Sequence, residues 1–158
     1  MGAHFRIAGG KFMKTAAQIL NSKSKNATYC TTAAASVFDA VKLMAERGIG
    51  ALVVMEGEAV VGIVTERDYA RKVILMGRTS RDTSVREIMT APVMYVRPNQ
   101  TSEECMALMT ENRLRHLPVM DNGKLIGLVS IGDLVKDVIS EQQFLIQQLQ
   151  HYIAGERG

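Results

Sequence analysis

Two short stretches of this sequence share one pattern of residues that suits the binding of a sugar diol. They read GIVTERD (62–68) and GLVSIGD (127–133), so that a hydroxyl residue is followed three positions later by an aspartate. The hydroxyl residue begins a predicted helix, where free backbone N–H groups and the helix dipole favour an anion. The aspartate, on the first helical turn, can accept two hydrogen bonds from the cis-diol of a ribose. The pattern therefore predicts two polar binding corners around Asp68 and Asp133.

The same spacing also has a purely structural interpretation. A Ser or Thr followed three residues later by an Asp is a common capping pair, in which both side chains bond to the backbone of their own helix. The glycine of each stretch either admits a close neighbour to the strand backbone or marks a bulge. Because the whole pattern occurs twice, we favour binding over capping alone.

Composition limits the other chemistry. The chain has 158 residues, a formal net charge of +3, 47% hydrophobic and 5% aromatic residues, which describes one mid-sized domain or two small ones with an aliphatic core. Cys30 and Cys105 have no Cys-x-x-Cys spacing and no nearby His pair, so we expect reduced thiols in the cytoplasm and no metal site. No apolar run reaches the length of a membrane span.

The chain repeats itself. Shifted by 65 residues, 36–74 aligns with 101–139 without a gap, and 11 of the 39 aligned positions are identical. Chance would give roughly two or three identities at ordinary residue frequencies. Asp68 and Asp133 are among these identities, so the two corners are equivalent parts of a duplication.

Each repeat predicts the same order of elements. Ser36 and Thr101 begin amphipathic helices at capping-box spacing. Two apolar runs then predict a hairpin, at 51–55 with 60–64 and at 117–120 with 125–129. A second helix follows each hairpin, at about 66–76 and from 131 onward. A short helix (15–20 and 84–89) and a short strand (near 28–31 and 93–96) precede each repeat.

We expect an α/β chain of the α+β kind, with duplicated β-α-β-β-α units packed with pseudo-twofold symmetry, since one unit of about 55 residues is marginal alone. The expected ranges are a disordered extension at 1–13, units at 14–78 and 79–140, and a C-terminal helix extension at 141–158. The last helix continues from Asp133 to about Ile153. Phe144 and Ile146 lie off its main apolar stripe, which favours a dimer contact over packing within the chain.

Together these features resemble a pair of cystathionine-β-synthase (CBS) domains, the Bateman module, as a stand-alone regulatory protein. Ile88-Met89-Thr90 before Val93 resembles the opening of the family, as 19–21 does more loosely. The segment LRHLPVMD (114–121) resembles the strand that begins the second half of a CBS unit. The resemblance covers about 14–139 and implies ligands in two clefts between the units: AMP, ADP, ATP or another adenosine compound such as NAD or S-adenosylmethionine.

The resemblance assigns roles to the residues of the two corners. Asp68 and Asp133 would hold ribose hydroxyls, and Thr65 and Ser130 would contact phosphate or ribose. Arg67, which the second repeat replaces with a glycine, would add a cation to the first corner.

The resemblance also predicts where the adenine and the phosphates lie. Adenine is expected against Thr90, Val93 and Met94 around the first corner. Around the second corner it is expected against 24–29, including Lys25 and Thr28. Arg115 and His116 are the expected phosphate-binding cations, so the second cleft should hold the more charged phosphate group, whereas Arg71 and Lys72 are expected to be solvated helix-face charges.

The sequence thus predicts a nucleotide sensor with no catalytic residue, in which occupancy shifts the packing of the units and is read by a homodimer or an unknown downstream protein. The alternative is an interaction scaffold with non-functional clefts. An enzyme is disfavoured because neither cysteine has a sequence-local base. The near-neutral charge disfavours nucleic acid, and no membrane partner is expected.

Overall fold

The structure is a computed structural model of the chain and describes residues 7–8, 11–12, 14–23 and 30–157. Most of the extension expected at 1–13 lies outside these ranges. Two short strands within it, β1 (Ile7–Ala8) and β2 (Lys11–Phe12), pair antiparallel.

The chain divides into two compact units. The first unit comprises 26–95 and 118–127, and the second comprises 1–25, 96–117 and 128–158. These ranges differ from those expected from the sequence, because the short helix that precedes each repeat hydrogen-bonds to the other repeat. Ala16 N–H donates to Gln100 O at 2.8 Å, and Val85 N–H donates to Ala35 O at 2.8 Å.

The first unit contains a mixed three-stranded sheet in the order β3 (Cys30–Thr32), β4 (Ala51–Glu56), β5 (Ala59–Thr65). β3 runs parallel to β4, and β4 runs antiparallel to β5. Its helices are α2 (Val37–Arg47), α3 (Glu66–Tyr69), the π-helix η1 (Ala70–Ile74) and α4 (Val85–Ile88). The predicted hairpin is confirmed, and the helix expected at 66–76 is divided into α3 and η1.

The local signals around α2 act as expected. The Ser36 side chain accepts the Asp39 N–H, and Gly48 closes the helix with a φ of 64°, a left-handed conformation that favours glycine. The apolar face of α2 packs against β4, β5 and α4 in one buried cluster, which includes Val37, Met44, Leu52, Val64 and Ile88. This core fixes the position at which β5 ends and α3 begins.

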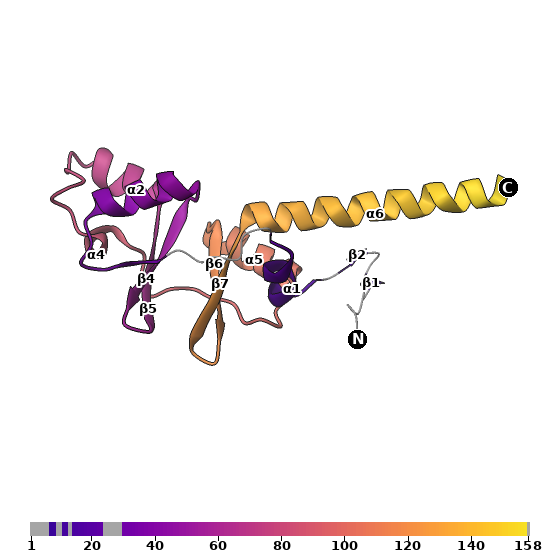
Figure 1. Ribbon diagram of the computed structural model, residues 1–158, viewed down its shortest axis with the longest axis horizontal. Coiled ribbons are helices and arrows are strands. Elements are labelled where there is room, and N and C mark those ends of the chain that lie inside the picture. Colours follow the sequence, from indigo (N-terminus) through magenta and orange to yellow (C-terminus); the bar gives the residue numbers. More distant parts are fainter. Residues whose placement is uncertain (1–6, 9–10, 13, 24–29, 158) are drawn as a thin grey trace. The chain divides into compact units, whose positions relative to one another are not determined.

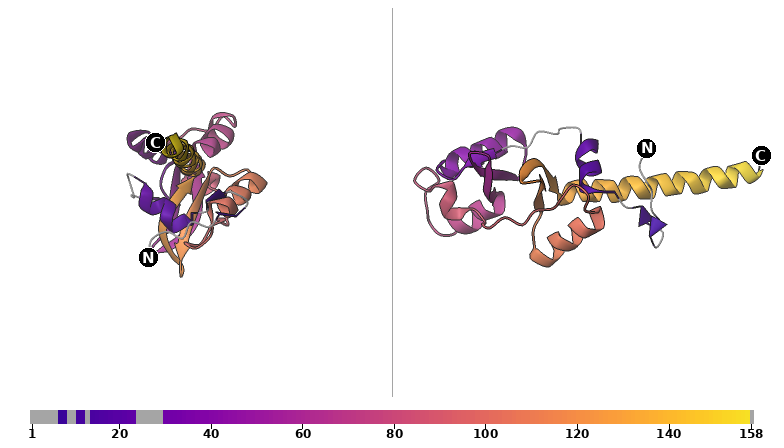
Figure 2. Two further views of the ribbon diagram at one scale, coloured as in Figure 1. Left: turned by 90° about the vertical axis from the view of Figure 1, so that its right-hand side faces the viewer. Right: turned by 90° about the horizontal axis from the view of Figure 1, so that it is seen from below.

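The second unit contains α1 (Ala16–Ser22), α5 (Ser102–Asn112) and α6 (Ile131–Arg157). The capping box expected at Thr101 and Glu104 is present. β6 (His116–Asp121) and β7 (Lys124–Ser130) form the second predicted hairpin. The turn of this hairpin and the strand residues next to it, 118–127, belong to the first unit. Figures 1 and 2 show α6 running past α1 and α5 of its own unit.

The prediction of a strand near 93–96 is wrong, because within this stretch only Val96 takes part in a β-bridge. Pro92 and Pro98 flank this stretch and cannot donate a backbone hydrogen bond to a sheet ladder. The predicted continuation of the last helix through 153 is confirmed. No helix in the ranges that the structure describes combines the length and the apolar character needed to cross a bilayer.

Candidate ligand-binding corners

The first corner forms where β5 ends and α3 begins. Thr65 N–H donates to Asp68 Oδ2 at 3.0 Å, and Asp68 N–H donates to Thr65 Oγ1 at 3.1 Å. The other carboxylate oxygen, Asp68 Oδ1, lies 3.2 Å from Lys72 Nζ, which also donates to Ile88 O at 2.9 Å. Lys72 is therefore an ion-pair partner of the predicted site residue, a role that the sequence did not predict, and its side chain stays 45% exposed.

A close neighbour explains why a glycine stands at position 62. A Cβ on Gly62 would lie 2.6 Å from Met89 Sδ and 3.2 Å from Thr90 O. Thr90 exchanges two backbone hydrogen bonds with Ile63, at 2.8 and 3.1 Å. The register of β4 and β5 also shifts opposite Gly62, so both the close approach and the bulge considered for this glycine are present. The pairing places Thr90 beside the strand that ends in the first corner.

The other residues predicted for the first corner lie in the same unit. Val93 is half-buried, Met94 is 39% exposed, and Arg67 is half-buried on α3. Their contacts with a ligand remain predictions.

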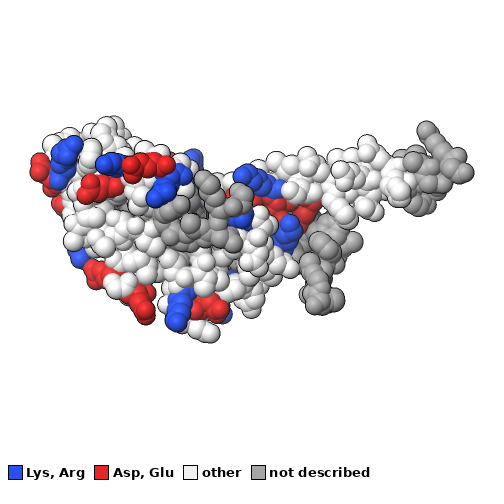
Figure 3. All heavy atoms as spheres, viewed as in Figure 1, with Lys and Arg blue, Asp and Glu red and all other residues white. Residues whose placement is uncertain are grey.

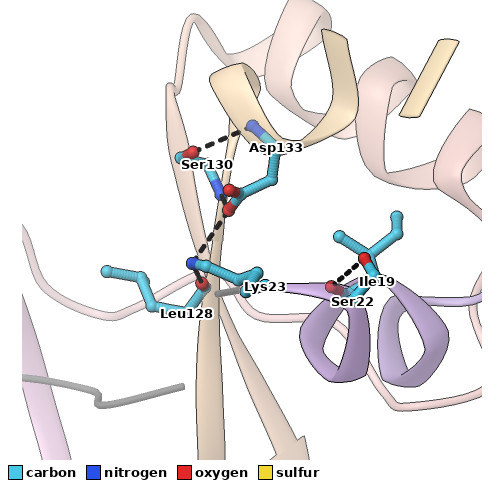
Figure 4. A network of polar contacts seen from close by, with 6 residues as sticks. All are labelled: Ile19, Ser22, Lys23, Leu128, Ser130 and Asp133. Carbon is cyan, nitrogen blue, oxygen red and sulfur yellow. Dashed lines mark hydrogen bonds and ion pairs between the residues drawn. The ribbon is translucent and has the colours of Figure 1, made fainter. Parts of the chain in front are cut away.

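The second corner repeats the capping geometry with a different lysine (Figure 4). Ser130 N–H donates to Asp133 Oδ2 at 2.8 Å, and Asp133 N–H donates to Ser130 Oγ at 3.1 Å. Lys23, which follows α1, places Nζ 2.9 Å from Asp133 Oδ2 and 2.9 Å from Leu128 O. Its ammonium group thus joins the segment before the first repeat to the end of the second hairpin.

The lysines make the two corners chemically different. Leu128 is the repeat equivalent of Ile63, whose carbonyl accepts a hydrogen bond from the Thr90 backbone. In the second corner the equivalent carbonyl accepts from a side chain, that of Lys23. Sequence analysis missed Lys23 because it lies 105 residues from Leu128 and belongs to no motif.

Local electrostatics set the charge of two predicted ligand contacts. Burial raises the pKa of Asp133, but the hydrogen bond from Ser130 and the Lys23 ammonium together hold it below its ordinary value. Burial lowers the pKa of His116 below its ordinary value of 6.5; Asp133 opposes this shift, while Lys23 and Arg115 reinforce it. Burial therefore favours the neutral form of the His116 imidazole, and the contact of His116 with phosphate remains a prediction.

Arg115 lies at the start of the second corner. Its carbonyl accepts the Ile131 N–H at 2.8 Å, which ties the residue before β6 to the first turn of α6. Its side chain is exposed, and its contact with phosphate remains a prediction.

A cavity of about 380 Å³ lies beside Asp133 in the second unit. This volume falls within the range of small-molecule sites. Lys14 Nζ lies 2.9 Å from Asp137 Oδ1 on one wall. The side chains around the cavity supply three ammonium groups and two carboxylates; the lining residues are Lys14, Ile19, Ser22, Lys23, Asp133, Lys136, Asp137 and Ser140.

Two predicted contacts of the second corner, Lys25 and Thr28, lie outside the described residues. Within the ranges that the structure describes, no three His, Cys, Asp or Glu side chains gather in a way that could hold a metal ion.

Comparison with known proteins identifies the family. The CBS domain matches residues 24–74 and 85–140, which is more than half of the chain. The chain belongs to the CBS domain family. The predicted α+β fold of paired CBS units with a C-terminal helix is confirmed.

Several CBS proteins are similar over most of the chain. A putative signal-transduction protein with CBS domains from Burkholderia ambifaria is 62% identical, with a TM-score of 0.79, over 82% of this chain and 96% of that one. The mitochondrial CBS domain-containing protein CBSX3 of Arabidopsis thaliana is 44% identical over 89% of this chain and 72% of its own length. A hexameric CBS-CP12 protein from bloom-forming cyanobacteria is 31% identical, with a TM-score of 0.71, over 78% of this chain and 67% of that one. None of these matches indicates an enzyme family.

Proposed function

We propose that this CBS pair is a regulatory module without catalytic activity that binds adenine nucleotides (AMP, ADP, ATP or NAD, with S-adenosylmethionine as a further candidate) at its two corners. The observation that carries the proposal is the same arrangement, found twice, of a hydroxyl residue, a helix start and a carboxylate held by a lysine. CBS domains generally bind adenosine compounds, which supports this ligand class.

Each aspartate would bind a ribose by exchanging partners. Asp68 uses Oδ2 in its cap and Oδ1 on Lys72, while Asp133 uses Oδ2 for both Ser130 and Lys23. A cis-diol that replaces the ammonium group as the partner of the carboxylate restores the lost hydrogen bonds. The cap can stay in place, because it uses the backbone N–H and the hydroxyl of the strand end.

The displaced lysine would then bind the phosphate of the same ligand. Its flexible stem lets the ammonium group move by several ångströms while the helix stays in place. The second corner has Lys14, Lys136 and exposed Arg115 nearby in addition to Lys23. We therefore assign the more highly phosphorylated ligand to this corner, with Arg67 and Lys72 as the cations of the first.

Ligand exchange at Lys23 would also produce a signal. In the unliganded state Lys23 links the segment before the first repeat to Asp133 and Leu128. Its release would loosen that link, and a ligand shifts a conformational equilibrium only by such a difference in interaction. The change would be read by a homodimer or by an unknown downstream protein.

Binding and the corner assignment can be tested together by calorimetry and thermal unfolding with adenosine, AMP, ATP and NAD. A ligand at 100 times its Kd stabilises the protein by about 2.7 kcal/mol. Asp68→Asn and Asp133→Asn should each remove one site, because the amide keeps a cap acceptor but loses the charge. Glu104→Gln, which changes the capping box of α5 in the same way, is the matched control and should keep both sites.

A second candidate, an interaction scaffold that binds no nucleotide, is favoured by one observation: both carboxylates already have partners within the chain. No shift in Tm with any of the four compounds would support the scaffold. Shifts that persist in both Asn variants would instead place the nucleotide elsewhere.

We also propose a reducing compartment such as the cytoplasm, because the two cysteines of the chain have no Cys-x-x-Cys spacing and give no disulfide framework. A fluorescent fusion expressed in the source cell would test it. Import into mitochondria, the compartment in the name of the Arabidopsis relative, would contradict the cytoplasm as this compartment.

A further inference from the structure

We propose that α6 pairs with α6 of a second copy of this chain as a parallel, in-register, two-stranded coiled coil. The inference specifies the surface of the homodimer proposed above and does not depend on nucleotide binding.

The distal part of α6 carries apolar side chains that its own unit leaves exposed. Val135 is 48% exposed, Ile139 48%, Ile146 54% and Leu149 64%. A different stripe, with Leu134, Val138 and Leu145, is buried or half-buried against the second unit. At 100° per residue the two stripes are centred about a quarter turn apart, so packing within the chain leaves the exposed stripe uncovered.

The exposed stripe follows a heptad repeat. Ile139, Ile146 and, by sequence, Ile153 fall at one core position, called a. Val135, Gln142 and Leu149 fall at the other core position, d. β-branched residues at a with leucine at d favour a two-stranded parallel coiled coil, and here isoleucine fills the a positions while Leu149 is the one leucine at d. Because the exposed stripe is offset by one residue from the buried stripe and points in another direction, one helix can pack against its own unit and against a partner at once.

The side chains beside the seam suit an identical partner. In a coiled coil, the flanking positions e and g of one helix face those of the other. From 139 to 153 these positions hold Gln143, Leu145, Gln150 and Tyr152, none of which is charged. Two identical helices therefore meet no like-charge repulsion at these positions, and Figure 3 shows no Lys, Arg, Asp or Glu on the visible face of the white part of α6 that extends beyond the rest of its unit.

Gln142 selects the parallel, in-register arrangement. An amide side chain is both donor and acceptor, so it can pair with its own copy across a two-fold axis. A single Asn or Lys at an a position fixes the register of coiled coils, and we extend this rule to Gln142 at d.

The length of α6 also requires a partner. All the described side chains from 146 to 151 are exposed, so this stretch makes little contact with its own unit. Helical segments of this length are marginal in water without packing of an apolar face. In Figures 1 and 2 the helix continues well past α1 and α5.

Sedimentation equilibrium of the full chain tests the pairing. The wild type should be a dimer at micromolar concentration, and Ile146→Lys should weaken the dimer at least about 100-fold, because it places two ammonium groups in the seam. Gln147→Lys, one position along and on the far side of the helix, adds the same charge and should leave the dimer intact. Unchanged thermal unfolding of the two units in Ile146→Lys would show that the chain still folds.

Cross-linking tests the register. In a Cys30→Ser background, Gln142→Cys should form an intermolecular disulfide on mild oxidation, whereas Gln147→Cys should not. A monomeric wild type overturns the proposal, as does a dimer that survives Ile146→Lys, which would place the dimer contact elsewhere. Equal cross-linking at both positions would overturn the register.

Discussion

Replacing Lys23 with methionine separates the two roles proposed for this side chain. Lys23→Met removes the ammonium group, which lies 2.9 Å from Asp133 Oδ2 and 2.9 Å from Leu128 O, but keeps most of the aliphatic stem. The unliganded protein should lose stability, whereas a ligand that needs Asp133 but not the ammonium should bind more tightly.

The expected magnitude follows from burial and contact number. The Lys23 side chain is 27% exposed and the Asp133 side chain 14%. Two charge-assisted contacts at this partial exposure contribute about 1–2 kcal/mol, after allowing for solvent screening. The pKa of Asp133 is depressed, so this stability is present at pH 7, above the ordinary value of 3.8, and is lost as the pH falls through the folded-state value.

The same free energy opposes ligand binding in the wild type. If a ribose must displace Lys23, then removing the Lys23 ammonium group should raise the affinity of the second corner for adenosine by about 5–30-fold, since 1.4 kcal/mol corresponds to a factor of ten. AMP should gain less, because its phosphate loses a cation. The ratio of AMP affinity to adenosine affinity should therefore fall.

Calorimetry in the Asp68→Asn background, where only the second corner remains, measures both affinities. Urea denaturation at pH 7 measures the loss of stability. Lys72→Met in the Asp133→Asn background is the matched experiment for the first corner. The reasoning is refuted if Lys23→Met leaves both the adenosine affinity and the ratio of affinities unchanged while the protein is destabilised as expected.

Three further predictions concern stability. Gly62→Ala should cost about 1–3 kcal/mol in urea unfolding, because its Cβ would meet Met89 Sδ at 2.6 Å; Met89→Ala in the same chain should recover part of the loss, and no recovery would contradict the clash. Because burial lowers the pKa of His116, the unfolded chain binds more protons below pH 6.5 and stability should fall from pH 7 to 5; His116→Gln should flatten that dependence in thermal unfolding, and an unchanged slope would exclude His116 as its source. Lys14→Met should lower the free energy of unfolding by about 1–3 kcal/mol, because it leaves the buried Asp137 carboxylate without its partner. Adding Asp137→Asn to this variant should restore stability if the ion pair is the cause.

Much of the candidate site was predictable from local patterns. The hydroxyl and the aspartate of each corner are three residues apart, so their geometry is decided by the helix start that they cap. The repeat showed that the two corners are equivalent. Ser36, Thr101 and the glycine at 48 marked helix ends for the same reason, since caps depend on residues within one turn.

The partners of the two aspartates were not predictable in this way. Lys72 has the same spacing as many solvated helix-face charges, and only the position of the Ile88 carbonyl shows that its ammonium group is held. Lys23 meets Asp133 only because α1 packs with the second repeat. The sequence could not indicate that the pKa of His116 is lowered, because that shift depends on burial.

The sequence by itself determined the duplication, the order of helices and hairpins, and the identity of the residues at each corner, because these are recorded in periodicity and in contacts between near neighbours. Only the tertiary structure decided which repeat each leading helix joins, which lysine holds each aspartate, and which stripe of α6 remains exposed. These outcomes depend on contacts between segments far apart in the chain, for which residue spacing carries no signal.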